Sequence, residues 1–321
     1  MAYYVGADIG GTTVKLAFIT EKGQIVHKWE ISTNIHNNGE EIPKEIVYSI
    51  ETKMQELRIP KEELLGLGAG APGYVNTNTG LVYEAVNVGW KNFNLKDKLS
   101  QRLQIPVYVT NDANLAALGE YWVGAGRNID HLITVTLGTG VGGGIVVNGQ
   151  VVNGIDGSGG EIGHVVVTPN DGPTCNCGRR GCIETYASAT GIARQGLEEV
   201  VKPVDTSLKN IFATTGTLTA KDIFEQAKDG DLVSKQIVEN TTNLLGIMLA
   251  NLATIINPGV IIIGGGVSKA KDTLLNPLKR AFEKYCLDHA FHNCEITIAQ
   301  LGNDAGVVGA AYYVKQHMNK K

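Results

Sequence analysis

The chain has 321 residues, 43% of them hydrophobic and 19% charged, and its formal net charge is −4. The composition excludes a disordered chain, the length suggests about two domains, and the small negative charge argues against nucleic acid or anionic membrane surfaces as partners. The N-terminal segment lacks the basic and apolar regions of a secretory signal, and no apolar run reaches the roughly 18 residues of a membrane helix. A cytoplasmic protein is therefore expected.

The first part of the chain predicts strands that alternate with helices. Apolar residues recur at helical spacing between residues 40 and 58, whereas the strands are short and rich in β-branched residues. The predicted elements are strands at 3–10 and 13–20 joined by a glycine turn, a helix at 40–58, a buried strand at 64–70, and a strand from 105 that runs into a helix beginning near Leu115.

The second part begins with another glycine-linked hairpin at 131–152, which repeats the plan of the first and indicates an internal duplication. An irregular, glycine- and cysteine-rich segment follows at 154–182, and then helices from 184 to 256. A buried strand at 260–264 leads into a helix that starts near Ser268, and a last helix ends the chain. Apolar strands alternating with helices favour a layered α/β protein.

Two glycine turns are candidate phosphate sites, because glycines let backbone N–H groups approach an anion and threonine hydroxyls add donors. A pair of such turns can clamp a polyphosphate, although each alone could be a plain hairpin. Asp8, at the end of the first strand, could orient Mg²⁺ through water. The residues of the turns are Gly10, Gly11 and Thr12 in the first, and Gly138, Thr139 and Gly140 in the second.

The glycines of the second turn, with Gly143, also match the dinucleotide fingerprint G-x-G-x-x-G. That interpretation is rejected because a β-branched segment with an Asn-Gly hairpin turn follows, where the fingerprint requires a helix. No P-loop motif is present either. Gly265 and Gly266 lie between a strand and a predicted helix, where they could leave room for a base or ribose or simply close the turn.

One histidine and three cysteines within residues 164–182 form a complete ligand set for Zn²⁺. Since the set leaves no open position, the zinc would be structural; the alternative is free buried cysteines. The odd cysteine count fits a reducing compartment better than a disulfide framework, and Cys286 and Cys294 are interpreted as ordinary cysteines. The proposed ligands are His164, Cys175, Cys177 and Cys182.

Asn111 and Asp112 end a predicted strand, where a carboxylate can accept a proton from a substrate hydroxyl. The alternative is an N-cap for the following helix. Glu161 and Glu184 flank the cysteine segment, and grouped carboxylates suit a polyhydroxylated ligand, although each alone could be a solvated surface acid.

Together these motifs resemble those of one family, the ROK (repressor and kinase) sugar kinases, and most of all its bacterial glucokinases. The similarity covers nearly the whole chain, and the cysteine block is its most specific part, since the glycine turns are shared more widely. The motifs are DIGGTTVK, GAPG at 70–73, AVNVGW at 85–90, TNDAN at 110–114, TLGTGVGGG, GEIGH, CNCGRRGCIE at 175–184 and IIIGGG.

The resemblance implies a two-domain actin-like ATPase (ribonuclease H-like) fold with the active site in the interdomain cleft. The expected domains are a small one at 1–115, completed by a C-terminal helix at 304–321, and a large one at 116–303 that carries the zinc site. The implied reaction is phosphorylation of the 6-hydroxyl of a hexose, most of all glucose, by ATP with Mg²⁺. A homodimer or homotetramer is also implied.

The resemblance assigns roles residue by residue. Asp112 is the implied catalytic base, and His164 would bind zinc through one ring nitrogen and sugar through the other. Asp8 would position Mg²⁺. The other implied sugar ligands are Gly70, Asn87, Asn111, Glu161 and Glu184, the implied phosphate-binding residues are those of the two glycine turns, and Gly265 and Gly266 would face the adenosine.

Several alternatives remain open at this point. Fructose, mannose, N-acetylglucosamine or N-acetylmannosamine could replace glucose, and polyphosphate could replace ATP. Repressors of the family carry an additional N-terminal DNA-binding segment, for which a phosphate turn that begins at residue 8 leaves no room. A non-catalytic sugar sensor is disfavoured because Asp112 and both phosphate turns are present.

Overall fold

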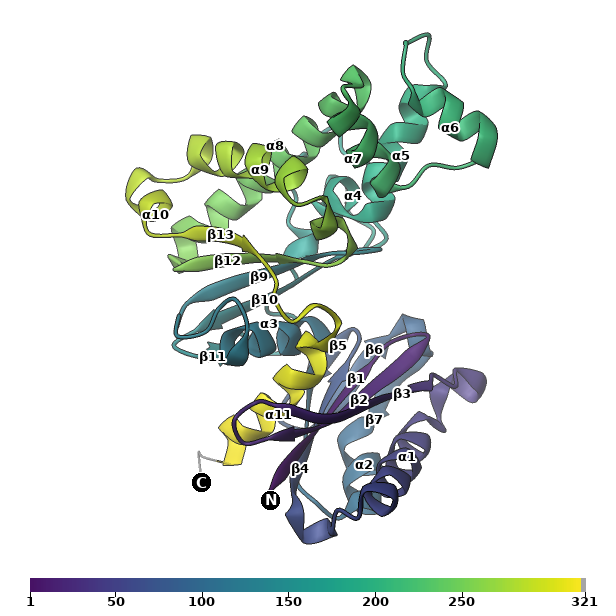
Figure 1. The fold of residues 1–321 in the computed structure, drawn as a ribbon, viewed down its shortest axis with the longest axis vertical. Coiled ribbons are helices and arrows are strands. Elements are labelled where there is room, and N and C mark those ends of the chain that lie inside the picture. The colour runs from purple at the N-terminus through teal and green to yellow at the C-terminus, as the bar shows by residue number, and fades with distance from the viewer. Residues whose placement is uncertain (319–321) are drawn as a thin grey trace. The chain divides into compact units, whose positions relative to one another are not determined.

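The computed structural model describes residues 1–318, which divide into two compact units (Figure 1). The first unit contains Met1–Asn128, Gly144–Gly160 and the chain from Gln300 on. The second contains Ile129–Gly143 and Glu161–Ala299. In residues 1–318 we find no helix that is both long and apolar enough to span a membrane.

The first unit is built on a five-stranded sheet with the order β3-β2-β1-β4-β8. β1, β4 and β8 are parallel, whereas β2 and β3 continue the sheet as antiparallel neighbours of β1. These strands span Tyr3–Ile9 (β1), Thr13–Thr20 (β2), Ile25–Ser32 (β3), Leu64–Ala71 (β4) and Val107–Asn111 (β8).

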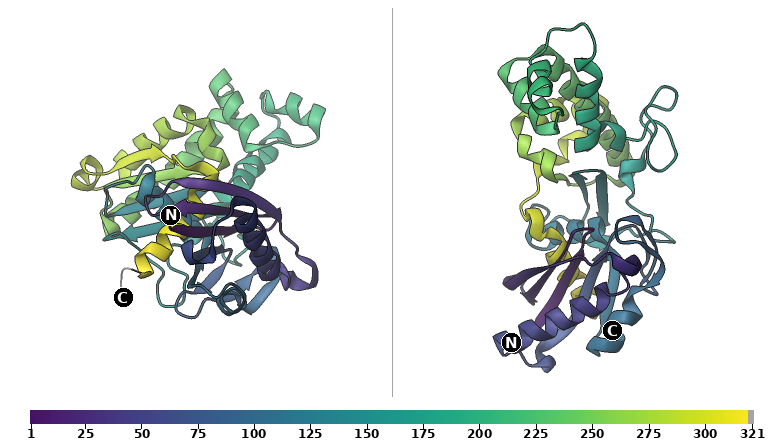
Figure 2. Two further views of the ribbon diagram at one scale, coloured as in Figure 1. Left: turned by 60° about the horizontal axis from the view of Figure 1, so that its bottom comes forward. Right: turned by 90° about the vertical axis from the view of Figure 1, so that its right-hand side faces the viewer.

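Helices cover both faces of this sheet (Figure 2), as the two-residue period of β1 requires. Val5 and Ile9 belong to the hydrophobic core formed with α1 and α2, whereas Tyr4 packs with α11. A second, smaller sheet has the order β5-β6-β7. The remaining elements of this unit are α1 (Ile42–Leu57), β5 (Tyr74–Asn76), β6 (Leu81–Ala85), β7 (Trp90–Asn94), α2 (Leu95–Leu103), α3 (Asp112–Val123) and α11 (Ala305–Met318).

The other five-stranded sheet has the order β11-β10-β9-β12-β13. Numbered within each sheet, both sheets read 3-2-1-4-5, so the internal duplication predicted from the two hairpins is confirmed by the strand order. The strands span Leu132–Leu137 (β9), Val141–Val147 (β10), Gln150–Val151 (β11), Val260–Gly264 (β12) and Glu295–Ile298 (β13).

Most of the helices predicted for residues 184–256 and beyond are present. Residues 154–182 are irregular, as expected, apart from one short 3₁₀ turn and isolated bridges. The helices are α4 (Glu184–Ala187), α5 (Ala189–Val200), α6 (Leu208–Thr215), α7 (Ala220–Asp229), α8 (Leu232–Ile256), α9 (Asp272–Tyr285) and α10 (Asp288–His292).

The boundaries of the compact units differ from those expected for the domains, at 115/116 and 303/304. A cut after residue 115 would divide α3, which is one continuous helix packed against α11. Residues 144–160 also belong to the first unit, where Gln316 Nε2 donates a hydrogen bond to the carbonyl of Gly149. The predicted C-terminal helix is α11, and residues 319–321 of that prediction lie outside the described residues.

Glycines allow α3 and α11 to approach closely. A Cβ built on Gly309 of α11 would lie 1.7 Å from the carbonyl oxygen of Leu115, and one on Gly119 would lie 2.2 Å from that of Ala305. Because backbone atoms cannot swing aside as a side chain can, this contact requires glycine at both positions.

We therefore expect Gly309→Ala to lower the free energy of unfolding by about 3 kcal/mol, as overpacking does. Helix propensity alone predicts the opposite sign, a gain of about 1 kcal/mol. Urea unfolding measures the difference. Gly138→Ala is the matched control, since nothing lies within 4 Å of a Cβ at that position. A stability of Gly309→Ala equal to or above that of the unmodified protein would contradict the steric argument.

Candidate functional site

The parallel strands of the first unit bring several predicted site residues to one edge of the sheet. Asp8 of β1 is in register with Gly70 of β4, and Gly70 is in register with Thr110 of β8. Asp112 follows directly, and a Cβ on Gly70 would lie 3.3 Å from its Cα. The carboxyl edge of parallel strands is where ligands bind in open α/β sheets.

Asn111 ends β8 and caps α3. Its Oδ1 accepts hydrogen bonds from the backbone N–H of Ala113 at 2.9 Å and of Asn114 at 3.2 Å, and its Nδ2 donates to the carbonyl of Gly73 at 3.0 Å. The helix therefore begins at Asp112, and the prediction of a start near Leu115 was wrong. The error arose because the cap lies inside the segment that the sequence predicted as strand.

Asp112 consequently occupies the first position of α3. Its Oδ1 accepts the backbone N–H of Ala113 at 2.9 Å. The positive end of the helix dipole favours a negative charge at this position. The sequence left capping and catalysis as alternative roles for Asn111 and Asp112. In the structure Asn111 is the cap, and Asp112 is the candidate for catalysis.

The first glycine turn is held by its own backbone and by β3. The N–H of Gly10 donates to the carbonyl of Thr13 at 3.0 Å, and Thr33 donates its N–H to Thr12 and its hydroxyl to Gly10, at 2.9 and 2.7 Å. A Cβ on Gly11 would lie 3.2 Å from the Cβ of Asn87. The fold thus brings Asn87 beside this turn.

Asp8 is a partly buried carboxylate at the start of this turn. Burial raises its pKa above the usual value of 3.8, and Lys15, its cross-strand partner, opposes the shift. A Cβ on Gly306, in the first turn of α11, would lie 2.6 Å from its Oδ2, so the carboxylate is closely packed. A buried charge that the fold does not need for packing is a candidate for function.

We expect Asp8→Asn to raise the melting temperature at pH 7 and to lower ATP turnover. Because the pKa of Asp8 is raised, the folded wild type holds its proton more tightly than the unfolded chain. Stability is therefore lost as the pH rises from 3.8 through the folded pKa, and the asparagine variant avoids that loss. Thermal unfolding between pH 3 and pH 8, about the range in which carboxyl groups titrate, measures the difference. A gain in melting temperature that is larger at acid pH than at neutral pH would contradict the raised pKa of Asp8.

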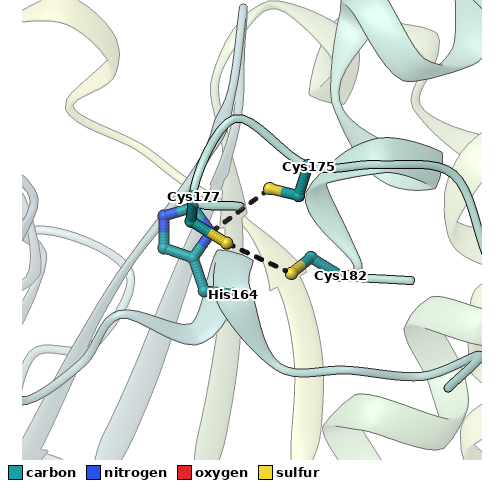
Figure 3. Close-up of side chains that lie close together, drawn as sticks. All are labelled: His164, Cys175, Cys177 and Cys182. Carbon is teal, nitrogen blue, oxygen red and sulfur yellow. Dashed lines mark hydrogen bonds between the residues drawn. The ribbon is translucent and has the colours of Figure 1, made fainter. Parts of the chain in front are cut away.

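The predicted metal ligands converge in the second unit (Figure 3). The four ligand atoms all lie within 4.8 Å of one another. The Sγ of Cys175 is 3.6 Å from His164 Nδ1, and the Sγ atoms of Cys177 and Cys182 are 3.6 Å apart. Gly181 allows the tight turn, since a Cβ there would lie 1.9 Å from the carbonyl oxygen of Thr168.

Burial and hydrogen bonding shift the pKa values of the three thiols in different directions. Hydrogen bonding from the backbone of Arg179 lowers the pKa of Cys177 to about 6, whereas burial raises that of Cys182 to about 12 and also raises that of Cys175. Three adjacent thiolates repel one another in the absence of a cation, and a divalent ion offsets that repulsion. A His/Cys₃ donor set is one that suits Zn²⁺.

Glu161 and Glu184 lie beside the metal ligands. Glu161 Oε2 is 4.0 Å from His164 Nε2, the ring nitrogen that faces away from Cys175. Burial raises the pKa of Glu161, and the charge of Glu184 adds to that effect, while His164 opposes it. The two ring nitrogens of His164 therefore have different neighbours, Cys175 at Nδ1 and Glu161 at Nε2.

The chain that leaves the cysteine segment holds the second glycine turn. Glu184 Oε2 accepts the N–H of Val141 at 3.0 Å. Ala189 donates its N–H to Gly138 at 2.7 Å, and the hydroxyl of Thr190 donates to the carbonyl of Thr139 at 2.8 Å. The short segment from Cys182 to Thr190 thus connects the last predicted metal ligand to the second glycine turn. No pattern in the sequence indicates this contact.

The glycines after β12 are at the same edge of the second sheet as this turn. Gly264 is in register with Thr136 of the parallel strand β9, and a Cβ on Gly265 would lie 2.4 Å from the carbonyl oxygen of Leu137. The prediction that a helix starts near Ser268 was wrong: a short 3₁₀ turn spans Gly266–Ala270, and α9 begins at Asp272. Lys271, with φ 49°, interrupts the helical path.

A cavity of about 670 Å³ opens beside these glycines, a size in the range of about 300–1,000 Å³ that is usual for small-molecule sites. It is lined by Gly266 and by the facing sides of α7 and of residues 269–273, including Phe224, Lys228 and Lys271. Gly266 was among the predicted site residues, whereas Phe224, Lys228 and Lys271 were not. The spacing of apolar residues predicts the buried face of α7, but not what its exposed face meets.

The predicted site residues thus form two groups, one in each unit. Those of the first unit lie at the edge formed by β1, β4 and β8, and those of the second lie around the cysteine cluster and after β9 and β12. The first group is Asp8, Gly10, Gly11, Thr12, Gly70, Asn87, Asn111 and Asp112, and the second is Gly138, Thr139, Gly140, Glu161, His164, Cys175, Cys177, Cys182, Glu184, Gly265 and Gly266.

Known proteins are similar to this chain over nearly its whole length. A glucokinase from Halalkalibacterium halodurans is 49% identical over 317 residues, which cover 99% of this chain and 96% of that protein. The crystal structure of a ROK family glucokinase from Streptomyces griseus, in complex with glucose and AMPPNP, matches with a TM-score of 0.77 at 34% identity, covering 98% of this chain and all of that one.

A ROK hexokinase from Thermus thermophilus matches with a TM-score of 0.82 at 28% identity, covering 99% of this chain and 100% of that chain. The expected two-domain actin-like ATPase fold is therefore confirmed. The sequence model of the ROK family matches residues 4–317. With nearly every described residue inside that match, the chain belongs to the ROK family.

Proposed function

We propose that the protein is a glucokinase, which transfers the γ-phosphoryl group of ATP to the 6-hydroxyl of glucose. The observation that carries the proposal is the position of Asp112, a carboxylate at the first residue of α3 and at the carboxyl edge of a parallel sheet. The chain is 49% and 34% identical to glucokinases from two organisms, and this similarity supports glucose over the other hexoses as the substrate.

In the proposed reaction the oxygen of the sugar 6-hydroxyl attacks the γ-phosphorus, and the bond from that phosphorus to the β,γ-bridging oxygen breaks. The hydroxyl proton passes to a carboxylate oxygen of Asp112, and ADP leaves with the bridging oxygen. Because the transition state of phosphoryl transfer is loose, the protein contributes mainly alignment and charge stabilisation. The glycine turns supply backbone N–H groups to the phosphates.

Glu161, His164 and Glu184 are the proposed partners of the other sugar hydroxyls. Carboxylates accept hydroxyl protons directionally, and a neutral imidazole whose Nδ1 is on the metal can only donate from Nε2. The 4.0 Å separation of His164 Nε2 and Glu161 Oε2 leaves both atoms able to contact one ligand oxygen. This arrangement selects a polyhydroxylated ring rather than a simple alcohol.

Two metal ions belong to the proposal. His164 and the three cysteines would hold Zn²⁺, which would fix the orientation of the imidazole without acting on the transferred group. Asp8 would orient the waters of an Mg²⁺ ion bound with ATP, which would neutralise charge on the phosphates. The cavity of about 670 Å³ beside Gly266 is the proposed site of the adenosine, with Phe224 offering an apolar surface to the base.

The proposal is tested by measuring formation of the hexose phosphate from glucose, mannose, fructose, N-acetylglucosamine and N-acetylmannosamine, each with ATP and with polyphosphate. We expect the highest kcat/KM for glucose with ATP. A higher value for another hexose would retain the mechanism and change the substrate. Absence of turnover with every sugar and both donors would overturn the proposal.

We also propose the cytoplasm as the location and a homodimer or homotetramer as the assembly. Unpaired thiols that must remain reduced to bind zinc suit a reducing compartment. Light scattering on the purified protein measures the assembly, and a monomeric mass would exclude that part of the proposal.

A further inference from the structure

The half-buried amide of Asn153 joins the two ends of the segment that carries Asp112. Asn153 Oδ1 accepts a hydrogen bond from the hydroxyl of Thr110 at 3.0 Å and another from Asn114 Nδ2 at 3.2 Å. Thr110 is the residue before the cap of α3 and is 0% exposed, and Asn114 is in the first turn of α3 and is 1% exposed. Asp112 lies between these two donors in the chain.

Only an acceptor can occupy the position of Asn153 Oδ1, since both of its partners donate. Asn114 depends on this contact in particular: its Oδ1 is buried with no hydrogen-bond partner among the described residues. The side-chain orientation of Asn114 is thus set by Asn153. A single oxygen therefore fixes the end of β8 relative to the start of α3.

The loop that carries Asn153 is itself held firmly. Val152 donates its N–H to Ile145 at 2.8 Å, and Gly159 donates its N–H to the carbonyl of Asn153 at 2.9 Å. Gly157 has φ +88°, and a Cβ there would lie 1.9 Å from the carbonyl oxygen of Val75, so the loop packs against the backbone at β5. The packing of the loop therefore restricts the movement of Asn153, and Asn153 in turn restricts the movement of the junction between β8 and α3.

We propose that Asn153 is a positioning residue for Asp112, and this inference rests on the proposed function. The amide acts through Thr110 and Asn114, which it holds on either side of Asp112. A general base must be held to within about 0.5 Å of its working position. A displacement of about 1 Å can reduce the rate about 100-fold, so loss of the amide affects turnover more than binding.

The test compares Asn153→Ala with the unmodified protein at a temperature well below both melting points. We expect kcat to fall by about 10- to 100-fold, with the KM for glucose and for ATP changed by less than about twofold, because the binding groups are not displaced. The metal content stays unchanged. Ile155→Ala is the matched control, since Ile155 is in the same loop and is 100% exposed.

A second variant separates positioning from folding. Thr110→Val preserves shape and removes one donor to Asn153, and we expect it to lower kcat in the same sense. If Thr110 and Asn153 act as one unit, the double variant loses no more than the larger of the two single losses. Thr110→Val also keeps the inference testable if Asn153→Ala does not fold.

The outcomes are distinguishable. A kcat of Asn153→Ala within twofold of the unmodified protein, an equal loss in Ile155→Ala, a loss confined to KM, or additive losses in the double variant would each overturn the positioning role. If the unmodified protein turns over no hexose, the proposed function has failed, and the assignment of Asp112 as the base fails with it. A melting temperature that falls while kcat is retained means that Asn153 has a structural role alone.

Discussion

Replacing Asp112 with asparagine should lower kcat by about 100- to 10,000-fold, the usual contribution of a general base. The amide has the shape of the carboxylate but cannot take the proton of the sugar hydroxyl. Its Oδ1 can still accept the N–H of Ala113, which lies 2.9 Å from Asp112 Oδ1 in the unmodified protein. Folding and glucose affinity should therefore be retained, and a coupled ADP-release assay with fluorescence titration of glucose measures both quantities.

The control for this variant is Asp288→Asn. Asp288 is also the first residue of a helix, α10, and its side chain is 94% exposed. Either substitution should cost only about 0.3–1 kcal/mol of stability through the helix dipole, so a difference in turnover reports catalysis rather than folding. A kcat for Asp112→Asn close to that of the unmodified protein would refute its assignment as the base.

Replacing Cys175 with serine should abolish stoichiometric zinc and lower kcat/KM for glucose by at least about 100-fold, since even indirect partners of metal ligands affect metal affinity 10- to 100-fold. Without the ion, His164 loses its fixed orientation, and the segment that ends at Thr190 loses its anchor. That segment makes two hydrogen bonds to the glycine turn at Gly138–Gly140 and a third to Val141, the residue that follows the turn. We therefore expect weaker nucleotide binding as well as weaker glucose binding.

Cys286→Ser provides the matched control, because it makes the same chemical change at a cysteine that does not belong to the cluster. Zinc content by elemental analysis, melting temperature and nucleotide affinity are measured on all three proteins. Chelation of the unmodified protein should reproduce the properties of Cys175→Ser, and added zinc should reverse them. Full nucleotide affinity in zinc-free protein would show that the contacts from Glu184 and Thr190 do not depend on the metal.

Much of the fold follows from patterns that act over short distances in the chain. The hairpin at residues 3–20 and the helix beginning near Ile42 were predicted because side-chain period and turn residues are local properties. The repeated hairpin predicted the duplication that the strand orders confirm. Helix ends were less certain, since Asn111 could be strand or cap and Gly266 could begin a turn or a helix, and only the observed hydrogen bonds decide between them.

The residue types of the candidate site were predictable from the sequence, but the residues that hold them in position were not. Cysteines 175, 177 and 182 lie close together in the chain, so their number and type alone predict a metal site, and the structure brings their ligand atoms together. The residues that hold the site were not predictable. Asn153 meets Thr110 across 43 residues of sequence, and Thr190 meets Thr139 across 51.

The sequence by itself determined the two hairpins, the helix after the first of them and the cluster of one histidine and three cysteines, because each of these depends on the residues of one short segment. The tertiary structure alone decided the unit boundaries, the cavity beside Gly266 and the junction held by Asn153. These depend on contacts between segments far apart in the chain. The type of a single residue, such as asparagine or lysine, does not indicate which residue it will contact in the folded protein.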